Sequence, residues 1–173
     1  MKIILNSIFL FSLMFLSTTC KKDDSPSQKG ANIMTAKIDG TAFKNKSCFG
    51  CYNGSGIGVE YDDSGYFAVT AEQLRFATIG FVVKGALAPG DYPLYSINGN
   101  YAQVNMYKEN GFKTYYTSTQ RNGTLHITKL DFEKKILSGT FEFTAEEQDN
   151  PSNTIKVTNG VVDVTFQVRI LNK

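Results

Sequence analysis

Residues 98–123, NGNYAQVNMYKENGFKTYYTSTQRNG, decide the fold prediction, because they contain three Asn-Gly pairs at regular spacing. The pairs begin at Asn98, Asn110 and Asn122, so each interval of twelve residues holds one strand and one tight turn. Type I′ turns need positive φ at both central residues, and Asn followed by Gly adopts that conformation readily. We therefore predict consecutive antiparallel hairpins with strands over residues 92–97, 100–109, 112–121, 124–132 and 136–145.

Alternation of apolar and polar residues extends the strand prediction to both sides of this segment. Near the C-terminus the dry face comprises Val162, Val164, Phe166, Val168 and Ile170, and the solvated face comprises Asp163, Thr165, Gln167 and Arg169. Similar dry faces comprise Leu137, Phe141, Phe143 and Ala145, and Ala77, Ile79, Phe81 and Val83. Two further Asn-Gly pairs, at Asn53 and Asn159, add turn signals outside the central segment.

These patterns predict a single all-β domain over residues 33–173. The alternation changes phase between Ile127 and Leu130, which indicates a β-bulge near Thr128. No segment shows helical periodicity over a useful length. We expect an antiparallel meander that forms a β-sandwich or flattened barrel with a filled core. A closed up-and-down barrel with a ligand cavity has the same alternation and is the alternative.

The N-terminal residues 1–19 have the character of a cleaved signal peptide. Lys2 precedes an apolar run over residues 3–16, which is shorter than the roughly 20 residues that a membrane-spanning helix needs. Residues 16–20, LSTTC, resemble a bacterial lipobox, in which the cysteine becomes acylated. We therefore predict lipidation of Cys20 and a flexible tether over residues 20–32. The alternative is a secreted protein with a free Cys20.

Charge gives no indication of a nucleic-acid partner. Removal of residues 1–19 takes away one charged residue, Lys2, and leaves 17 Lys and Arg against 16 Asp and Glu. A near-neutral chain has no electrostatic footprint for nucleic acid or anionic lipid. The acidic run at residues 146–149, EEQD, is typical of a solvated loop.

Several phrases of the sequence resemble a family of small, uncharacterised Bacteroidota surface lipoprotein domains. They are MTAKIDG at 34–40 with Phe43 behind it, LAPGDYPL at 87–94, LSGTFEFTA at 137–145 and VTNG at 157–160. Residues 20–24, CKKDD, resemble the export signal of the same class. The resemblance implies an outer-membrane lipoprotein that is exposed at the cell surface. It implies no activity, so it transfers no functional residue.

The motif Cys48-Phe49-Gly50-Cys51 predicts a short-loop disulfide between Cys48 and Cys51 in an oxidising compartment. A redox pair would need a following helix, but residues 52–58 are rich in glycine. Haem attachment would need a histidine at position 52, and zinc would need two more ligands. Unpaired thiols are the remaining alternative.

Catalytic signals are weak. The one histidine, His126, is expected to be a partly exposed strand residue on the side opposite Leu125 and Ile127. No Gly-x-Ser-x-Gly elbow accompanies it. Glu60 with Asp62 could serve as paired carboxylates, but Asp62 is better explained by a turn over residues 62–65.

Tyrosines crowd the central segment and form the candidate ligand-binding site, with Tyr101, Tyr107 and Tyr115 as its predicted residues. Exposed tyrosines can stack on sugars or anchor a protein partner. The alternative is that they form cross-strand pairs without a ligand. Tryptophan is absent from the chain, which weakens the case for sugars.

The sequence therefore predicts a membrane-anchored, non-enzymatic binding module of the cell envelope, which needs no cofactor and no metal. Its expected partners are the lipid membrane, through acylated Cys20, and a glycan, a peptide or an envelope protein. The alternatives are an accessory or structural lipoprotein of an envelope complex and, third, a hydrolase.

Overall fold

The computed structural model describes residues 25–46, 56–86, 88–109 and 111–169. The predicted signal peptide, Cys20, Cys48, Cys51 and the Asn53 turn lie outside these residues. Within the described ranges the secondary structure is entirely β, and no helix there has the length and apolar character needed to cross a membrane. The strands are β1 (Ile33–Ile38), β2 (Thr41–Lys44), β3 (Ile57–Asp62), β4 (Phe67–Gln73), β5 (Ala77–Val83), β6 (Gly90–Leu94), β7 (Tyr101–Lys108), β8 (Gly111–Tyr116), β9 (Gly123–Asp131), β10 (Ile136–Glu147), β11 (Asn150–Thr165) and β12 (Val168–Arg169).

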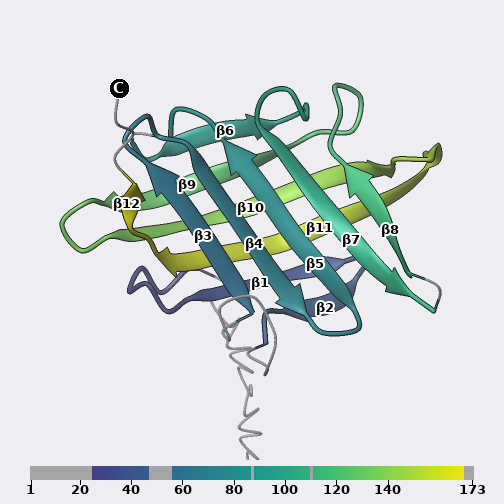
Figure 1. The fold of residues 1–173 in the computed structure, drawn as a ribbon, viewed down its shortest axis with the longest axis horizontal. Coiled ribbons are helices and arrows are strands. Elements are labelled where there is room, and N and C mark those ends of the chain that lie inside the picture. Colours follow the sequence, from purple (N-terminus) through teal and green to yellow (C-terminus); the bar gives the residue numbers. More distant parts are fainter. Residues whose placement is uncertain (1–24, 47–55, 87, 110, 170–173) are drawn as a thin grey trace, which may run out of the picture.

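One large sheet folds over itself into two layers that cross each other (Figure 1). The first layer contains β3, β4, β5, β7 and β8, and the second contains β6, β9, β10, β11, β1 and β2. At one end β8 pairs with the last residues of β10 and joins the layers, whereas at the other end β12 pairs in parallel with β3. All other pairs are antiparallel.

The hydrogen-bonded order runs from β12 to β2 without joining these two ends, so the sheet is not closed into a barrel. The all-β sandwich prediction is therefore confirmed, and the closed-barrel alternative is wrong. The physical reason is that, among the described strands, the end strands β12 and β2 pair only with β3 and β1, and the strands that leave the path, β6 and β9, pair at β10 and do not bridge the two ends.

The core lies between the layers and is built from the faces that alternation predicts. The predicted dry faces are buried as expected: Ala77, Ile79, Phe81 and Val83 of β5, and Leu137, Phe141, Phe143 and Ala145 of β10. Phe81 of β5 and Phe141 of β10 meet across the layers, with ring centroids 5.3 Å apart. Burial of each such side chain stabilises the fold by roughly 1.5–3 kcal/mol.

The Asn-Gly pairs do not all close hairpins. β7 and β8, the strands on either side of Asn110, pair with each other as predicted. The pair at Asn98 leads from β6 to β7, and the pair at Asn122 leads from β8 to β9, but neither pair of strands is hydrogen-bonded. At both places the chain crosses from one layer to the other. A local turn signal fixes a change of direction, whereas the choice of neighbouring strand depends on which layer buries the strand's apolar face.

Two bulges adjust the long strands. The register of β9 against β10 shifts at Thr128, which confirms the bulge expected there. Asn159, with φ of +52°, and Gly160 form a second irregularity inside β11, where the Asn-Gly pair indicated a turn. The inward face consists of odd-numbered residues before this point, such as Val157, and of even-numbered residues after it, such as Val162. The bulge therefore lets one strand of sixteen residues keep its apolar side on the core.

Three predicted surface assignments are wrong. Asp163 is fully buried, because residues 27–30 lie over it. Glu146 and Glu147 end strand β10 instead of forming a solvated loop, and Glu147 is buried. Val168 belongs to the separate strand β12 and is partly exposed.

Candidate functional site

A cleft opens at the end of the molecule where β10 turns into β11, and we call it the loop-end cleft. Its volume is about 620 Å³, within the range of small-ligand sites. The loop after β6 contributes Tyr95 and Ile97, the segment from Tyr116 to Thr119 follows β8, and the end of β10 contributes Glu146 and Glu147. Tyr95 and Ile97 are among the exposed large apolar residues of the described chain.

Backbone hydrogen bonds hold the loops of this cleft in place. The N–H groups of Tyr95 and Ser96 donate to the carbonyl of Asn100 at 2.9 and 3.0 Å. The N–H of Ser118 donates to the carbonyl of Arg121 at 2.7 Å, and the N–H of Arg121 donates back to Ser118 Oγ at 3.1 Å. Because their hydrogen bonds are internal, these loops present the cleft side chains in a preformed arrangement.

A polar network behind the loop-end cleft holds Glu147, which lines it. Lys113 Nζ lies 2.8 Å from Glu147 Oε1, and Asn153 Nδ2 donates to Glu147 Oε2 at 2.5 Å and to the Tyr115 hydroxyl at 3.2 Å. The hydrogen bond from Lys113 holds the pKa of Glu147 below its usual range, and the same contact raises the pKa of Lys113. The cleft therefore carries an ionised carboxylate that is already paired with a cation.

Aromatic residues continue from this cleft onto the outer face of the first layer. The rings of Tyr101 and Tyr116 meet edge to face with centroids 6.3 Å apart. Burial, followed by the nearby phenols of Tyr66 and Tyr116, raises the pKa of Tyr101. We call Tyr66, Tyr101 and Tyr116 the tyrosine row. Tyr116 belongs to both the row and the cleft, so the two surfaces are continuous.

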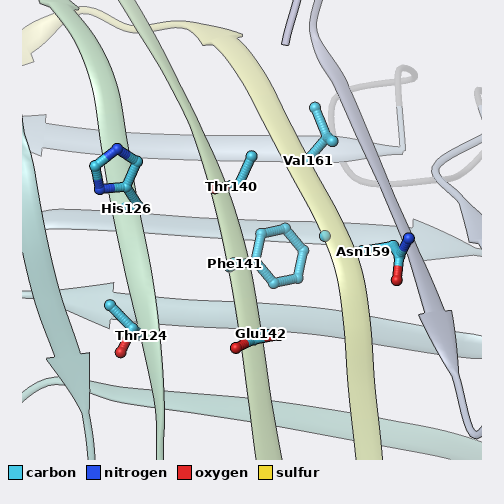
Figure 2. A pocket seen from close by; sticks show the side chains of 8 residues that line it. Thr124, His126, Thr140, Phe141, Glu142, Asn159 and Val161 are labelled. Atoms are coloured by element: carbon cyan, nitrogen blue, oxygen red, sulfur yellow. The ribbon is translucent and has the colours of Figure 1, made fainter. Parts of the chain in front are cut away.

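A second hollow of about 410 Å³ lies on the outer face of β9, β10 and β11 (Figure 2). His126 borders it, with Nδ1 2.5 Å from Asp91 Oδ1 on β6. Thr140 is the cross-strand partner of His126, so Asp91, His126 and Thr140 follow one another across three strands. The side chains of His126 and Asp91 are 52% and 72% exposed, and water screens their interaction.

The described residues contain no candidate metal site. Among residues 25–46, 56–86, 88–109 and 111–169, no group of three His, Cys, Asp or Glu is placed to hold an ion. The position of His126 agrees with the sequence interpretation, because it is an exposed strand residue opposite the buried Leu125 and Ile127. Asp62 accepts hydrogen bonds from Ser64 and Tyr66 and caps a turn, as its sequence context indicates.

The structure separates the three tyrosines predicted as a ligand site. Tyr101 lies half-buried in the tyrosine row, and Tyr107 is on the same outer face, where its hydroxyl donates to Glu72 at 2.9 Å. Tyr115 is only 4% exposed and points into the core. Sequence reasoning placed Tyr95 and Tyr116 in the crowded segment but did not single them out. Apolar residues next to a turn, such as Ile97 before Asn98, are the signal that could have indicated the cleft.

Comparison of the sequence with known protein families finds a match. Residues 33–165 match the family described as domain of unknown function DUF6252. The chain belongs to this family. The match extends from the first residue of β1 to the last residue of β11, so the DUF6252 domain includes both layers, the loop-end cleft and the tyrosine row. No curated protein and no solved structure matches the chain.

Proposed function

We propose that this protein is an outer-membrane lipoprotein, anchored through acylated Cys20 and exposed at the cell surface, whose domain binds a glycan without catalysing a reaction. The supporting observation is the continuity of the loop-end cleft with the tyrosine row. Ring faces suit stacking against sugars, and the hydroxyls of Ser96, Ser118 and Thr119 line the cleft beside them and can donate or accept hydrogen bonds.

The dimensions and chemistry of the cleft support a sugar segment rather than a deeply enclosed ligand. The cleft is open to solvent, and its walls mix aromatic, hydroxyl and carboxylate groups. Tyrosine provides the stacking surfaces here, because the chain contains no tryptophan. An extended ligand could run from the cleft along Tyr116 and Tyr101, which lie in direct ring contact.

A glycan array with the mature protein tests this proposal, followed by thermal shift with each ligand that binds. A ligand at 100 times its dissociation constant adds about 2.7 kcal/mol to the free energy of unfolding, which corresponds to several degrees. We expect Tyr95→Ala and Tyr116→Ala to weaken binding at least tenfold. Phe112→Ala is the matched control, because Phe112 is exposed but lies at the other end of β8. Equal weakening by all three variants would contradict the proposed site.

A second candidate is an accessory lipoprotein that contacts an envelope protein, and one surface favours it. Phe112 is 64% exposed and pairs across strands with Tyr107, which is also exposed. Leu74, in the turn between β4 and β5, is exposed as well. Photo-crosslinking from position 112 in intact cells should capture a defined protein, and Tyr107→Asp, on the neighbouring strand, should abolish the capture from position 112. Undiminished capture in the Tyr107→Asp background would contradict this candidate.

Acylation of Cys20 is tested separately. Full-length protein expressed with an alkyne fatty acid should incorporate the label and fractionate with outer membranes, whereas Cys20→Ser should do neither. Protease added to intact cells should degrade the wild-type protein, because the proposal places it on the outer surface. Labelling of Cys20→Ser to the wild-type level would refute acylation at this residue.

We also propose that the Asp91–His126–Thr140 arrangement is not catalytic. The imidazole and the carboxylate stand on an open sheet face, where solvent screens charge and no enclosed site excludes water. Purified protein should therefore show no turnover across an ester and glycoside panel. Turnover that His126→Ala removes would overturn this part of the proposal.

A further inference from the structure

The first described residues do not hang free from the domain. We call residues 25–32 the N-terminal strap, and they lie on the outer face of β10 and β11. Asp163 of β11 is fully buried and accepts hydrogen bonds from Ser27 Oγ, from Gly30 N at 2.9 Å and from Lys29 N at 3.3 Å. Ser138 Oγ of β10 donates to the same carboxylate at 2.7 Å. One buried carboxylate thus ties three strap residues to the sheet.

Further contacts fix the middle of the strap and its C-terminal end. Lys129 Nζ of β9 donates to the carbonyl of Gln28 at 3.0 Å. Asn32 Oδ1 accepts hydrogen bonds from Thr165 N at 2.9 Å and from Thr165 Oγ1 at 3.0 Å. Gly30 has φ of +70°, and a Cβ there would stand 2.6 Å from Thr165 Cγ2, so the backbone fits closely against β11. The segment expected from sequence to be a flexible tether is therefore docked from Ser27 onward.

Docking of the strap shortens the connection to the lipid. Only residues 21–26 separate Cys20 from Ser27, and seven peptide units span at most about 25 Å when fully extended. If the tether were free as far as Ile33, the corresponding limit would be about 45 Å. The docked strap therefore keeps the end of the domain to which it is bound near the lipid surface.

The surface beside the strap suits a lipid headgroup layer. Phe132 begins the turn between β9 and β10 and is 47% exposed, although one side of its ring packs against Tyr61 and Phe166. Lys134 and Lys135 lie in the same turn, and Lys29 and Lys129 belong to the docked strap and to the strand beneath it. Asp131 lies 3.8 Å from Lys129, and Glu133 is in the same turn, so the four lysines and two carboxylates leave this surface with a net charge of +2. An exposed aromatic ring on a surface of net positive charge matches phosphate groups over hydrocarbon.

The loop-end cleft lies at the opposite end of the same strands. The turn between β9 and β10 and the turn between β10 and β11 lie at opposite ends of the molecule (Figure 1). Ser138, which contacts Asp163, and Glu146, which lines the cleft, are eight residues apart on β10, a separation of about 26 Å. A domain held by its strap would therefore direct the cleft away from the lipid.

We infer that the strap-bearing end, with Phe132, Lys134 and Lys135, rests on the phosphate-bearing headgroup layer of the membrane and holds the loop-end cleft toward the exterior. This inference rests on the acylation of Cys20 in the proposed function. It adds a defined orientation and a membrane-contacting surface, which a flexible tether alone would not provide.

Photo-crosslinking on vesicles tests the orientation. Full-length acylated protein is reconstituted in phosphatidylcholine–phosphatidylglycerol vesicles with benzoylphenylalanine in place of Phe132 or, as the control, Ile97. We expect lipid adducts from position 132 at least fivefold above those from position 97. Flotation with equal adducts from both positions would overturn the orientation alone. Failure of the acylated protein to float would refute the anchor, and with it this inference.

Release of the strap gives an independent readout. Ser27→Ala combined with Asp163→Asn should leave flotation unchanged and lower the lipid adducts from position 132 severalfold, because the domain gains a longer tether. If the double variant does not fold, Ser27→Ala alone leaves the buried Asp163 carboxylate intact and serves the same purpose. Hydrogen exchange should show protected amides at Lys29 and Gly30 in the wild-type protein, and rapid exchange at both would overturn the docked strap.

Discussion

Phe141 lies directly across from Gly160 in the antiparallel pair of β10 and β11, and its ring occupies the space that a side chain at position 160 would need. A Cβ at Gly160 would stand 2.5 Å from Phe141 Cδ2 and 2.4 Å from the Phe141 carbonyl oxygen. The absence of this side chain lets the ring settle in the core, where it meets Phe81 of the other layer. The glycine therefore serves packing between the layers.

We expect Gly160→Ala to lower the free energy of unfolding by about 1–3 kcal/mol, because the new methyl group clashes with backbone as well as with the ring. Urea unfolding followed by tyrosine fluorescence measures the change. Gly99→Ala is the control, since the nearest atom to its Cβ would be the flexible Tyr95 hydroxyl, at 3.3 Å, and the nearest backbone atom would lie at 3.8 Å. A loss as large for Gly99→Ala as for Gly160→Ala would contradict the packing explanation.

Asp163→Asn should destabilise the domain by about 2 kcal/mol near neutral pH, because a buried carboxylate loses charge-assisted hydrogen bonds. Burial alone would raise the pKa of Asp163, but hydrogen bonds from Ser27, Ser138 and the strap backbone outweigh it and hold the pKa below 3.8. A lowered folded-state pKa contributes stability above the unfolded value, and the contribution is lost as pH falls through the folded value.

The difference in unfolding free energy between wild type and Asp163→Asn should therefore be full at pH 7 and shrink below about pH 4. Urea unfolding at pH 7, 5 and 3 measures it. Asp91→Asn is the control and should change stability by less than about 1 kcal/mol, because its carboxylate is exposed. A difference for Asp163→Asn that stays constant from pH 7 to pH 3 would show that its charge has no role.

Two tyrosines that look alike in sequence should behave differently. Tyr115→Ala removes a buried core ring and should cost about 3–5 kcal/mol of stability. Tyr101→Ala removes a half-buried ring of the outer face, so its main effect should be on glycan affinity. Thermal unfolding and glycan titration of both variants separate the roles. Wild-type affinity in Tyr101→Ala would exclude Tyr101 from the binding surface.

His126→Ala should change stability by less than about 1 kcal/mol, because its pair with Asp91 is solvent-exposed. Binding at the loop-end cleft should be unchanged, since His126 borders the separate hollow on β9 to β11. Chemical unfolding and glycan titration provide the two measurements. A loss of affinity comparable with that of Tyr116→Ala would show that the ligand extends to this second hollow.

The sequence by itself determined the strands and their inward faces. Period-two alternation identifies the buried residues from Ala77 to Val83 and from Leu137 to Ala145, because a strand with one dry face must place every second side chain on it. The phase change near Thr128 likewise indicates the bulge that the β9–β10 register shows. Both features depend only on residues close together in the chain.

Tertiary structure decided the strand pairs that are not local hairpins, and it decided which polar residues are buried. The Asn98 and Asn122 turns redirect the chain, but pairing of β6 with β9 depends on the layer that each strand covers. The sequence pattern predicts that Asp163 is solvated. In the fold it is buried, because Ser27 and Gly30, more than 130 positions away in the chain, donate hydrogen bonds to it. The loop-end cleft likewise joins three loops that are distant in sequence. Local patterns fix the face of each strand, whereas long-range contacts decide what covers it.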